Sequence, residues 1–110
     1  MAEFKRSMPI RQDEPLESED KSRLVDTSSV TVKFSQDVMS LEIANNSDDA
    51  TIYLNISGGI ATLDLGIPIY SKQYYSADKK IKKDIGISLI SDKVSTDVRI
   101  IGHFNLEAEE

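Results

Sequence analysis

The side chains best suited to chemistry are a single histidine and scattered carboxylates, and their spacing does not assemble a reaction centre. His103 is the only histidine, and the chain has no cysteine. A nucleophilic triad or a zinc site would need this histidine together with partner residues of matching type. It stands beside Phe104 near the end of a predicted strand, which favours a structural or solvated side chain. We therefore expect no catalytic residue, no metal ligand and no cofactor.

The acidic and glycine motifs also favour turns over binding sites. Asp48-Asp49 and Asp78 lack the spaced D-x-D-x-D-G pattern of a calcium loop, so we expect solvated turns. Gly58-Gly59 lacks the Lys-Ser/Thr ending of a phosphate-binding loop, so it predicts a turn or bulge. The acids of a glycosidase pair need not be close in sequence. That alternative stays open, although a domain this small rarely forms a substrate cleft.

Two sets of residues suit contacts with partners. The run Lys79–Lys83 is the one basic segment, and we expect a solvated loop there. The sharper alternative is docking to the acidic arm or tail of another copy. Tyr53, Tyr70, Tyr74 and Tyr75 either pack within sheets or form a subunit or ligand surface, because tyrosine buries area while its hydroxyl bonds.

These residues must be positioned by strands, because apolar and polar residues alternate along most of the chain. A period of two indicates a sheet with one dry face and one wet face. It places Tyr53 opposite to Ile52 and Leu54, and it places Asp97 and Arg99 together on one face. Arg99 is thus a candidate contact for charges of a neighbour. The predicted strands are Ser29–Phe34, Met39–Ala44, Ala50–Ile56, Ile85–Ile90 and Thr96–Phe104, with a further short one at Ile60–Leu65.

Turn signals separate these strands. Asn45–Asp49 is a strong turn segment, because its side chains bond to the nearby backbone. Pro68 cannot donate to a sheet ladder, so Gly66–Tyr70 should lie at a sheet edge or in a crossing loop. Ser71–Ser76 reads as a turn, and Ile85, Ile87 and Leu89 should share one face. Short, evenly spaced strands predict an all-β fold, an antiparallel β-sandwich or a jelly-roll-like domain.

The ends of the chain differ from this body. Residues 1–27 hold two of the three prolines, an acidic cluster and few large apolar residues. We expect an extended or disordered N-terminal arm, and either state fits the composition. If the arm orders on a neighbouring subunit, its anchors would be Phe4, Met8, Ile10 and Leu16. The body is predicted over residues 28–106, and residues 107–110 form an acidic tail.

Composition excludes several classes of function. The net charge of −6 disfavours general binding to nucleic acid, and we expect no such partner. No apolar run approaches the roughly 20 residues needed to span a bilayer, so no membrane partner is expected. The N-terminus lacks the continuous apolar stretch of a secretory signal. Without cysteine, disulfides and thiolate metal sites are excluded.

Two stretches together resemble a known group of proteins. One runs Leu41-Glu42-Ile43-Ala44-Asn45-Asn46-Ser47-Asp48-Asp49-Ala50-Thr51-Ile52-Tyr53-Leu54, and the other is Ile85–Ile100, with S-L-I-S-D and T-D-V-R. Ile67-Pro68-Ile69 and Tyr74-Tyr75-Ser76 lie between them. This order resembles small β-sandwich structural proteins of tailed-bacteriophage particles, over about Leu41 to Ile101. The chain departs from that pattern by its lysine run and its long polar arm.

The resemblance implies a non-enzymatic component of a virion, of the head-decoration or minor capsid type, assembled in the host cytoplasm. Its partners would be other copies of itself, a trimer being plausible, and the major capsid or other virion proteins. The contacts would use a sheet face and the arm. The alternative is a fibre, neck or baseplate module that recognises a host-surface glycan or protein. It would use loops at one end, Asn45–Asp49, Lys72–Lys83 and Ser91–Ser95.

Overall fold

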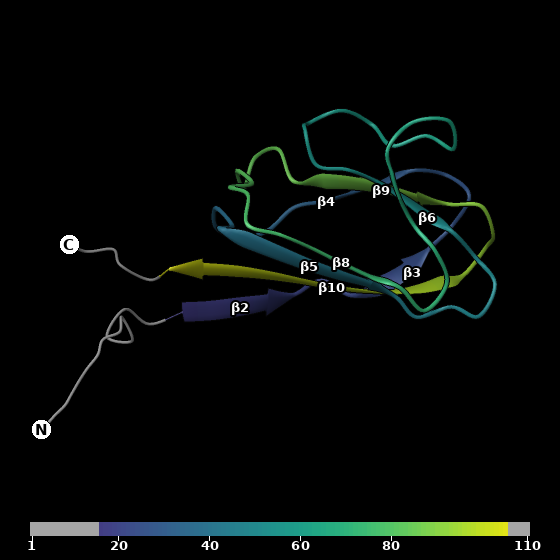
Figure 1. Cartoon of the computed structure of the whole chain (residues 1–110). Helices are drawn as coiled ribbons and strands as arrows, with labels where there is room; N and C mark the ends of the chain where they lie inside the picture. Colours follow the sequence, from purple (N-terminus) through teal and green to yellow (C-terminus); the bar gives the residue numbers. More distant parts are fainter. Residues whose placement is uncertain (1–15, 106–110) are drawn as a thin grey trace, which may run out of the picture.

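Two antiparallel sheets face each other and form a β-sandwich in the computed structural model, which describes residues 16–105 (Figure 1). This confirms the predicted all-β class, and the described residues include no helix. The five-stranded sheet has the order β2-β10-β5-β8, with β3 also paired to β10. The four-stranded sheet has the order β4-β9-β6-β7. The strands are β2 Leu16–Asp20, β3 Arg23–Val25, β4 Val30–Val32, β5 Ser40–Asn45, β6 Ile52–Asn55, β7 Ile67–Ile69, β8 Tyr74–Ala77, β9 Ile87–Ser91 and β10 Thr96–Asn105.

The core fills the space between the sheets. Along β5, β6 and β10, inward side chains are buried and outward ones are at least partly exposed, as the period of two predicts. Ile52 and Leu54 from one sheet and Ile43 and Ile100 from the other are fully buried. Full burial of such a side chain contributes about 1.5–3 kcal/mol. Among the described residues, the buried core cluster consists of Val, Leu and Ile side chains together with Phe34.

The predicted boundary at Ser28 is wrong, because residues 16–25 already belong to the sandwich. The long strand β10 pairs with β3 over Thr96–Val98 and with β2 over Ile101–Asn105. At the break between the two short strands, the Ile100 amide donates to Ser22 Oγ at 3.0 Å and its carbonyl accepts from the Lys21 amide at 2.8 Å. Polar composition concealed these strands, since an edge strand buries few side chains. Residues 1–15 and 106–110, including the predicted acidic tail 107–110, lie outside the described residues.

The segment predicted as a strand at Ile60–Leu65 is instead a loop that covers the four-stranded sheet. Ala61 is buried, and its amide donates to Ser88 Oγ at 2.9 Å. Beneath the loop, all five residues of β9 are buried on both faces. Ile87 and Leu89 share the core-facing side of β9 as predicted, whereas Ile85 is exposed before the strand begins.

The proline segment lies at a sheet edge, as predicted. β7 contains Pro68 and pairs only with β6 in the described part of the chain, so the missing amide disturbs no second ladder. The predicted turn at Ser71–Ser76 is too long, because β8 begins at Tyr74 and pairs with β5. The actual turn is confined to Ser71 and Lys72, and Lys72 adopts a positive φ of 62°.

Candidate interaction surfaces

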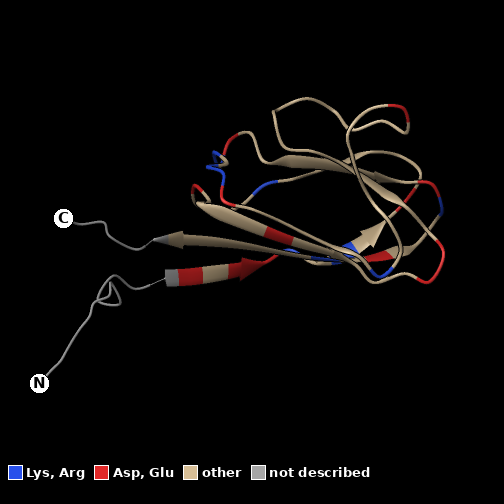
Figure 2. Ribbon diagram, viewed as in Figure 1, with Lys and Arg blue, Asp and Glu red and all other residues tan. Residues whose placement is uncertain are grey.

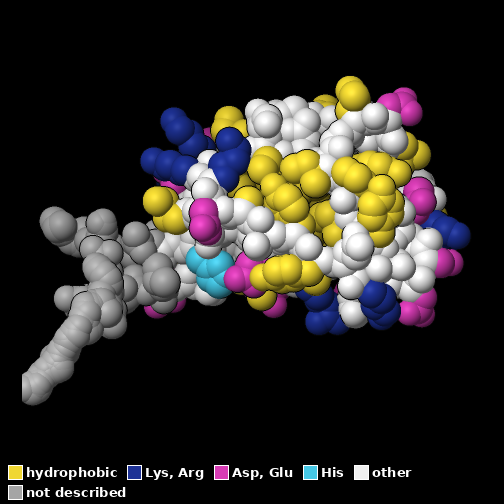
Figure 3. Space-filling model, in the orientation of Figure 1, with side chains coloured by type: hydrophobic (Ala, Val, Ile, Leu, Met, Phe, Trp, Pro, Cys, Tyr) yellow, Lys and Arg dark blue, Asp and Glu magenta, His cyan; other side chains and the backbone are white. Residues whose placement is uncertain are grey.

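An apolar surface extends along the covering loop and β7, over residues 60–70. This stretch contains only two polar side chains, Thr62 and Asp64. Ile60 is 68% exposed, Leu63 47%, Leu65 71% and Tyr70 53%, and Pro68 is also exposed. Figure 3 shows hydrophobic side chains gathered on one face of the molecule. We call residues 60–70 the apolar segment.

Polar contacts hold the turn of the apolar segment, and the core contacts of buried Ile69 and half-buried Ile67 hold its β7 end. Thr62 Oγ1 accepts the amides of Asp64 at 3.3 Å and Leu65 at 3.0 Å, which closes a tight turn. Buried Ala61 attaches this turn to β9 through Ser88. The exposed side chains of Ile60, Leu63 and Leu65 are therefore free to contact a partner without loss of the core.

The four tyrosines singled out by the sequence do not form one face. Tyr53 lies opposite Pro68 on the outer side of the four-stranded sheet and is half-buried, which confirms its predicted direction. Tyr70 belongs to the apolar segment. Tyr75 packs against the core from β8, whereas Tyr74 lies on the outer face of the other sheet. Only Tyr70 is placed for a contact together with the exposed aliphatic residues.

A row of polar side chains crosses the outer face of the five-stranded sheet. His103 Nδ1 lies 2.8 Å from Ser18 Oγ on β2, and its Nε2 lies 3.0 Å from Glu42 Oε2 on β5. Tyr74 on β8 follows in the same row: reduced hydration, then a hydrogen bond and the charge of Glu42, raise the pKa of its hydroxyl. His103 thus joins neighbouring strands, which fits the structural role predicted for it. The row gives this sheet face a polar character, unlike the apolar segment.

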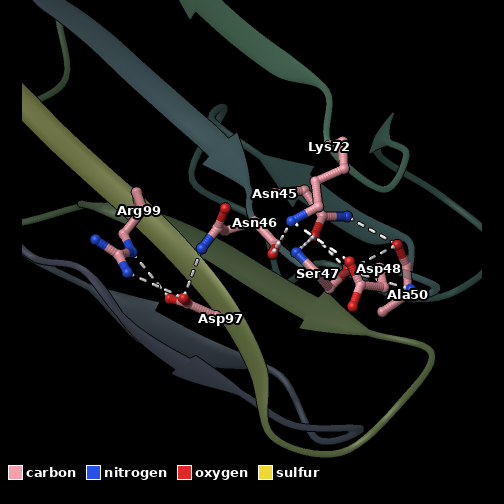
Figure 4. Close-up of polar contacts among 8 residues, drawn as sticks. All are labelled: Asn45, Asn46, Ser47, Asp48, Ala50, Lys72, Asp97 and Arg99. Atoms are coloured by element: carbon pink, nitrogen blue, oxygen red, sulfur yellow. Dashed lines mark hydrogen bonds and ion pairs between the residues drawn. The ribbon is translucent and has the colours of Figure 1, made fainter.

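Arg99 lies on the same outer face and is held by its own strand. Its Nε and Nη2 donate to the Asp97 carboxylate at 3.0 and 3.1 Å, and Asn46 donates to the same carboxylate at 2.9 Å (Figure 4). The hydrogen bond from Arg99, followed by that from Asn46, lowers the pKa of Asp97. The predicted shared face is confirmed. Because an exposed ion pair contributes only about 0–1 kcal/mol, this pair offers alignment more than affinity.

The loops proposed for glycan recognition do not meet at one end. Lys72 lies beside Asn45–Asp49: its Nζ contacts the Asn46 carbonyl at 3.1 Å and the Asp48 carboxylate at 3.4 Å (Figure 4). Lys93 reaches Asp49 at 3.4 Å from the loop after β9. Lys79–Lys83 instead lies beyond the other end of β8, where Ile81 pairs with Val38. The prediction that all three loops lie at one end of the domain is therefore wrong for Lys79–Lys83.

The lysine run borders a hollow of about 190 Å³. Its lining combines basic residues with aliphatic ones: Ile56, Ser57, Lys79, Lys80, Ile81, Lys82, Ile85 and Gly86. Lys80 pairs with Asp37 at 3.8 Å, and the Lys83 amide donates to the same carboxylate at 2.9 Å. The sequence identified the lysines but not the hollow, because Ile56 and Ile85 come from distant segments. We call these lining residues the lysine hollow.

Sequence reasoning missed the role of Asn45, which connects the two sheets. Its amide is buried at the end of β5 and donates to the carbonyls of Ala50 and Ile69, each at 2.8 Å. Its side-chain oxygen accepts from the amide and hydroxyl of Ser47 at 3.0 and 2.6 Å (Figure 4). An Asn at the end of an alternating strand was the only available signal.

The described residues hold neither a candidate metal site nor a candidate membrane helix. Among residues 16–105, no group of three or more His, Asp or Glu side chains is placed to hold a metal ion. No helix there has the length and hydrophobicity of a membrane span. The proposed arm anchors Phe4, Met8 and Ile10 lie outside the described residues; Leu16 opens β2, and its side chain is not described. No protein-family model and no curated protein sequence matches this chain.

Proposed function

We propose that this protein is a non-enzymatic structural subunit that self-associates and binds neighbouring subunits of a virus particle. The resemblance to bacteriophage sandwich proteins supports the assignment to a virus particle. Within the particle we favour a capsid decoration or minor capsid role. The exposed apolar segment is the observation that carries the proposal. It replaces the sheet face that the sequence suggested, because the outer face of the five-stranded sheet is polar.

The energetic argument rests on the exposed aliphatic side chains. Ile60 and Leu65 each leave about two thirds of their surface in water. Burial of the remaining surface would contribute about 1–2 kcal/mol for each side chain. That is sufficient for a weak contact between two subunits. Repetition on a lattice then strengthens binding through avidity.

The first test is the oligomeric state of the purified protein by sedimentation velocity across a concentration series. We expect I60S/L65S to weaken self-association about tenfold or more, since a loss of about 1.4 kcal/mol is a factor of ten. The matched control is L24S/V94S, which changes two other exposed aliphatic residues, 62% and 69% exposed, outside this segment. The urea midpoints of both variants should stay close to that of the wild type. Equal association in both variants would remove the apolar segment from the proposal.

The second test concerns the particle and the N-terminal arm. The protein should sediment with virus particles, and deletion of residues 1–15 should lower its occupancy. Deletion of residues 1–27 is unsuitable, because it also removes β2 and β3 with the fully buried Val25. Absence of the full-length protein from particles would contradict the virion role. Unchanged occupancy after deletion of residues 1–15 would remove the arm alone.

A further inference from the structure

We propose that the lysine hollow of one copy receives the acidic β2–β10 ribbon of a second copy. This inference rests on the proposed self-association and names a second contact for it. Phe104 and Asn105 pair only with Glu17 and Leu16 among the described residues, so this two-stranded ribbon continues past the last pair between β10 and β5. Figure 2 shows acidic residues along β2 and basic residues in the loop after β8.

The ribbon end is strongly acidic. Residues 13–20 and 106–110 contain eight acidic residues and no Lys or Arg. Two of the acids serve the fold: Glu19 accepts from Ser35, and Asp20 accepts from the Ser22 amide. Glu17 is exposed and has no ion pair with another described residue. Leu16 and Asn105, the first and last described residues, pair with each other.

The lysine hollow is complementary in both charge and polarity. Lys79, Lys80 and Lys82 border it, while Ile56 and Ile85 supply an apolar lining. Lys79 and Lys82 make no ion pair with a described residue. The acidic segments contain leucine–glutamate pairs, Leu16-Glu17 and Leu106-Glu107. In such a pair the glutamate is complementary to the basic rim of the hollow and the leucine to its aliphatic lining.

We place the contact between two copies, because Glu17 on β2 is exposed and makes no ion pair with another described residue of its own copy. β2 is an outer strand on one side of β10 and β5, and β8, which leads into the lysine loop, is the outer strand on the other side. A contact between different surfaces of the two copies is heterologous, and it builds either a closed ring or an open chain.

The test reverses the charges separately. We expect K79E/K82E and E14K/E17K each to weaken self-association at least about tenfold at low salt, because like charges then face each other. A 1:1 mixture of the two variants should associate again, since each supplies the intact site that the other lacks. The fourfold variant should also recover. K72E/K93E is the control, because it reverses two lysines at the opposite end of β8 and β9 from the hollow.

The outcomes separate this inference from the proposed function. Association of K79E/K82E at wild-type strength would overturn the hollow as an interface and leave self-association intact. Weak association that neither mixing nor the fourfold variant restores would show that the two sites do not meet. A wild-type protein that stays monomeric at every salt and concentration would overturn both proposals. Unchanged urea midpoints confirm that the variants are folded.

Discussion

Asn45 connects the two sheets, because its side chain joins the end of β5 to β7 and to the turn that follows β5. It donates to the carbonyls of Ala50 and Ile69 and accepts twice from Ser47. Its backbone also bonds with Gln73 and Lys72, so four segments depend on one residue. The turn Asn45–Asp49 was predicted from composition alone. Burial of its first residue was not, because burial follows from the approach of β7.

Replacement of Asn45 tests this role. In N45D a carboxylate would face the carbonyl oxygens of Ala50 and Ile69, and both donated hydrogen bonds would be lost. We expect a loss of at least about 3 kcal/mol in the free energy of unfolding, measured by urea denaturation. N46A is the control, because exposed Asn46 makes one side-chain bond to Asp97, and it should lose about 1 kcal/mol or less. A loss below about 1 kcal/mol in N45D would contradict the role of Asn45.

Among the elements, β2 shows how a segment of mostly polar residues joins a sandwich through its backbone. Its amides and carbonyls complete the ladder of β10, and Glu19 fixes it to the loop after β4. Ser35 donates to Glu19 Oε1 from its amide at 2.9 Å and from its hydroxyl at 3.0 Å. Lys21 adds an ion pair at 3.4 Å. No apolar period marks such a strand, so the sequence favoured an arm.

Glu19 makes the attachment of β2 dependent on pH. The backbone hydrogen bond from Ser35 is the largest cause that lowers the pKa of Glu19 below its ordinary value of 4.5. A carboxyl with a lowered pKa in the folded state stabilises the fold above the unfolded pKa, and this contribution is lost as pH falls through the folded pKa. We expect the urea midpoint of E19Q to change less than that of the wild type from about pH 5 to about pH 3.

E17Q controls for the change in net charge, since it alters the same strand without removing a hydrogen bond between described residues. A wild type and an E19Q variant with parallel pH dependence would show that Glu19 does not couple β2 to the body. Comparison of S35A with the wild type then separates the hydroxyl bond from the amide bond, because the amide donor remains in S35A.

Alternation marks three of the strands clearly, whereas β9 and the apolar loop beside it do not alternate. β5, β6 and β10 each have one solvent-facing side, so alternation in the sequence predicts that Leu41, Ile52 and Val98 point into the core. β9 has none, because the loop through Ala61 covers its outer face. The apolar residues Ile60, Leu63 and Leu65 of that loop led the sequence analysis to predict a strand. A run of apolar residues can be a strand that a loop covers or an exposed part of such a loop, and periodicity in the sequence does not distinguish the two.

For the whole molecule, the two surfaces that we propose as contacts differ in kind. The apolar segment lies along the loop over the four-stranded sheet and β7, and the acidic ribbon lies at the β2 edge of the five-stranded sheet. The lysine hollow lies between the loop after β8 and the residues that follow β6 and precede β9. A subunit with one apolar and one charged contact can form each independently. Neither was visible as a site in the sequence, because each depends on segments that only the fold brings together.

The two contacts should respond to salt in opposite directions, and single-surface variants isolate each response. In I60S/L65S the remaining association should weaken as sodium chloride rises from 50 to 500 mM, because screening shortens the reach of exposed charges. In K79E/K82E the remaining association should strengthen as ammonium sulfate is added, because sulfate favours burial of apolar surface. Sedimentation velocity at matched protein concentrations measures both. If both variants respond to each salt in the same direction, a single surface accounts for the association, and the division into apolar and charged contacts is wrong.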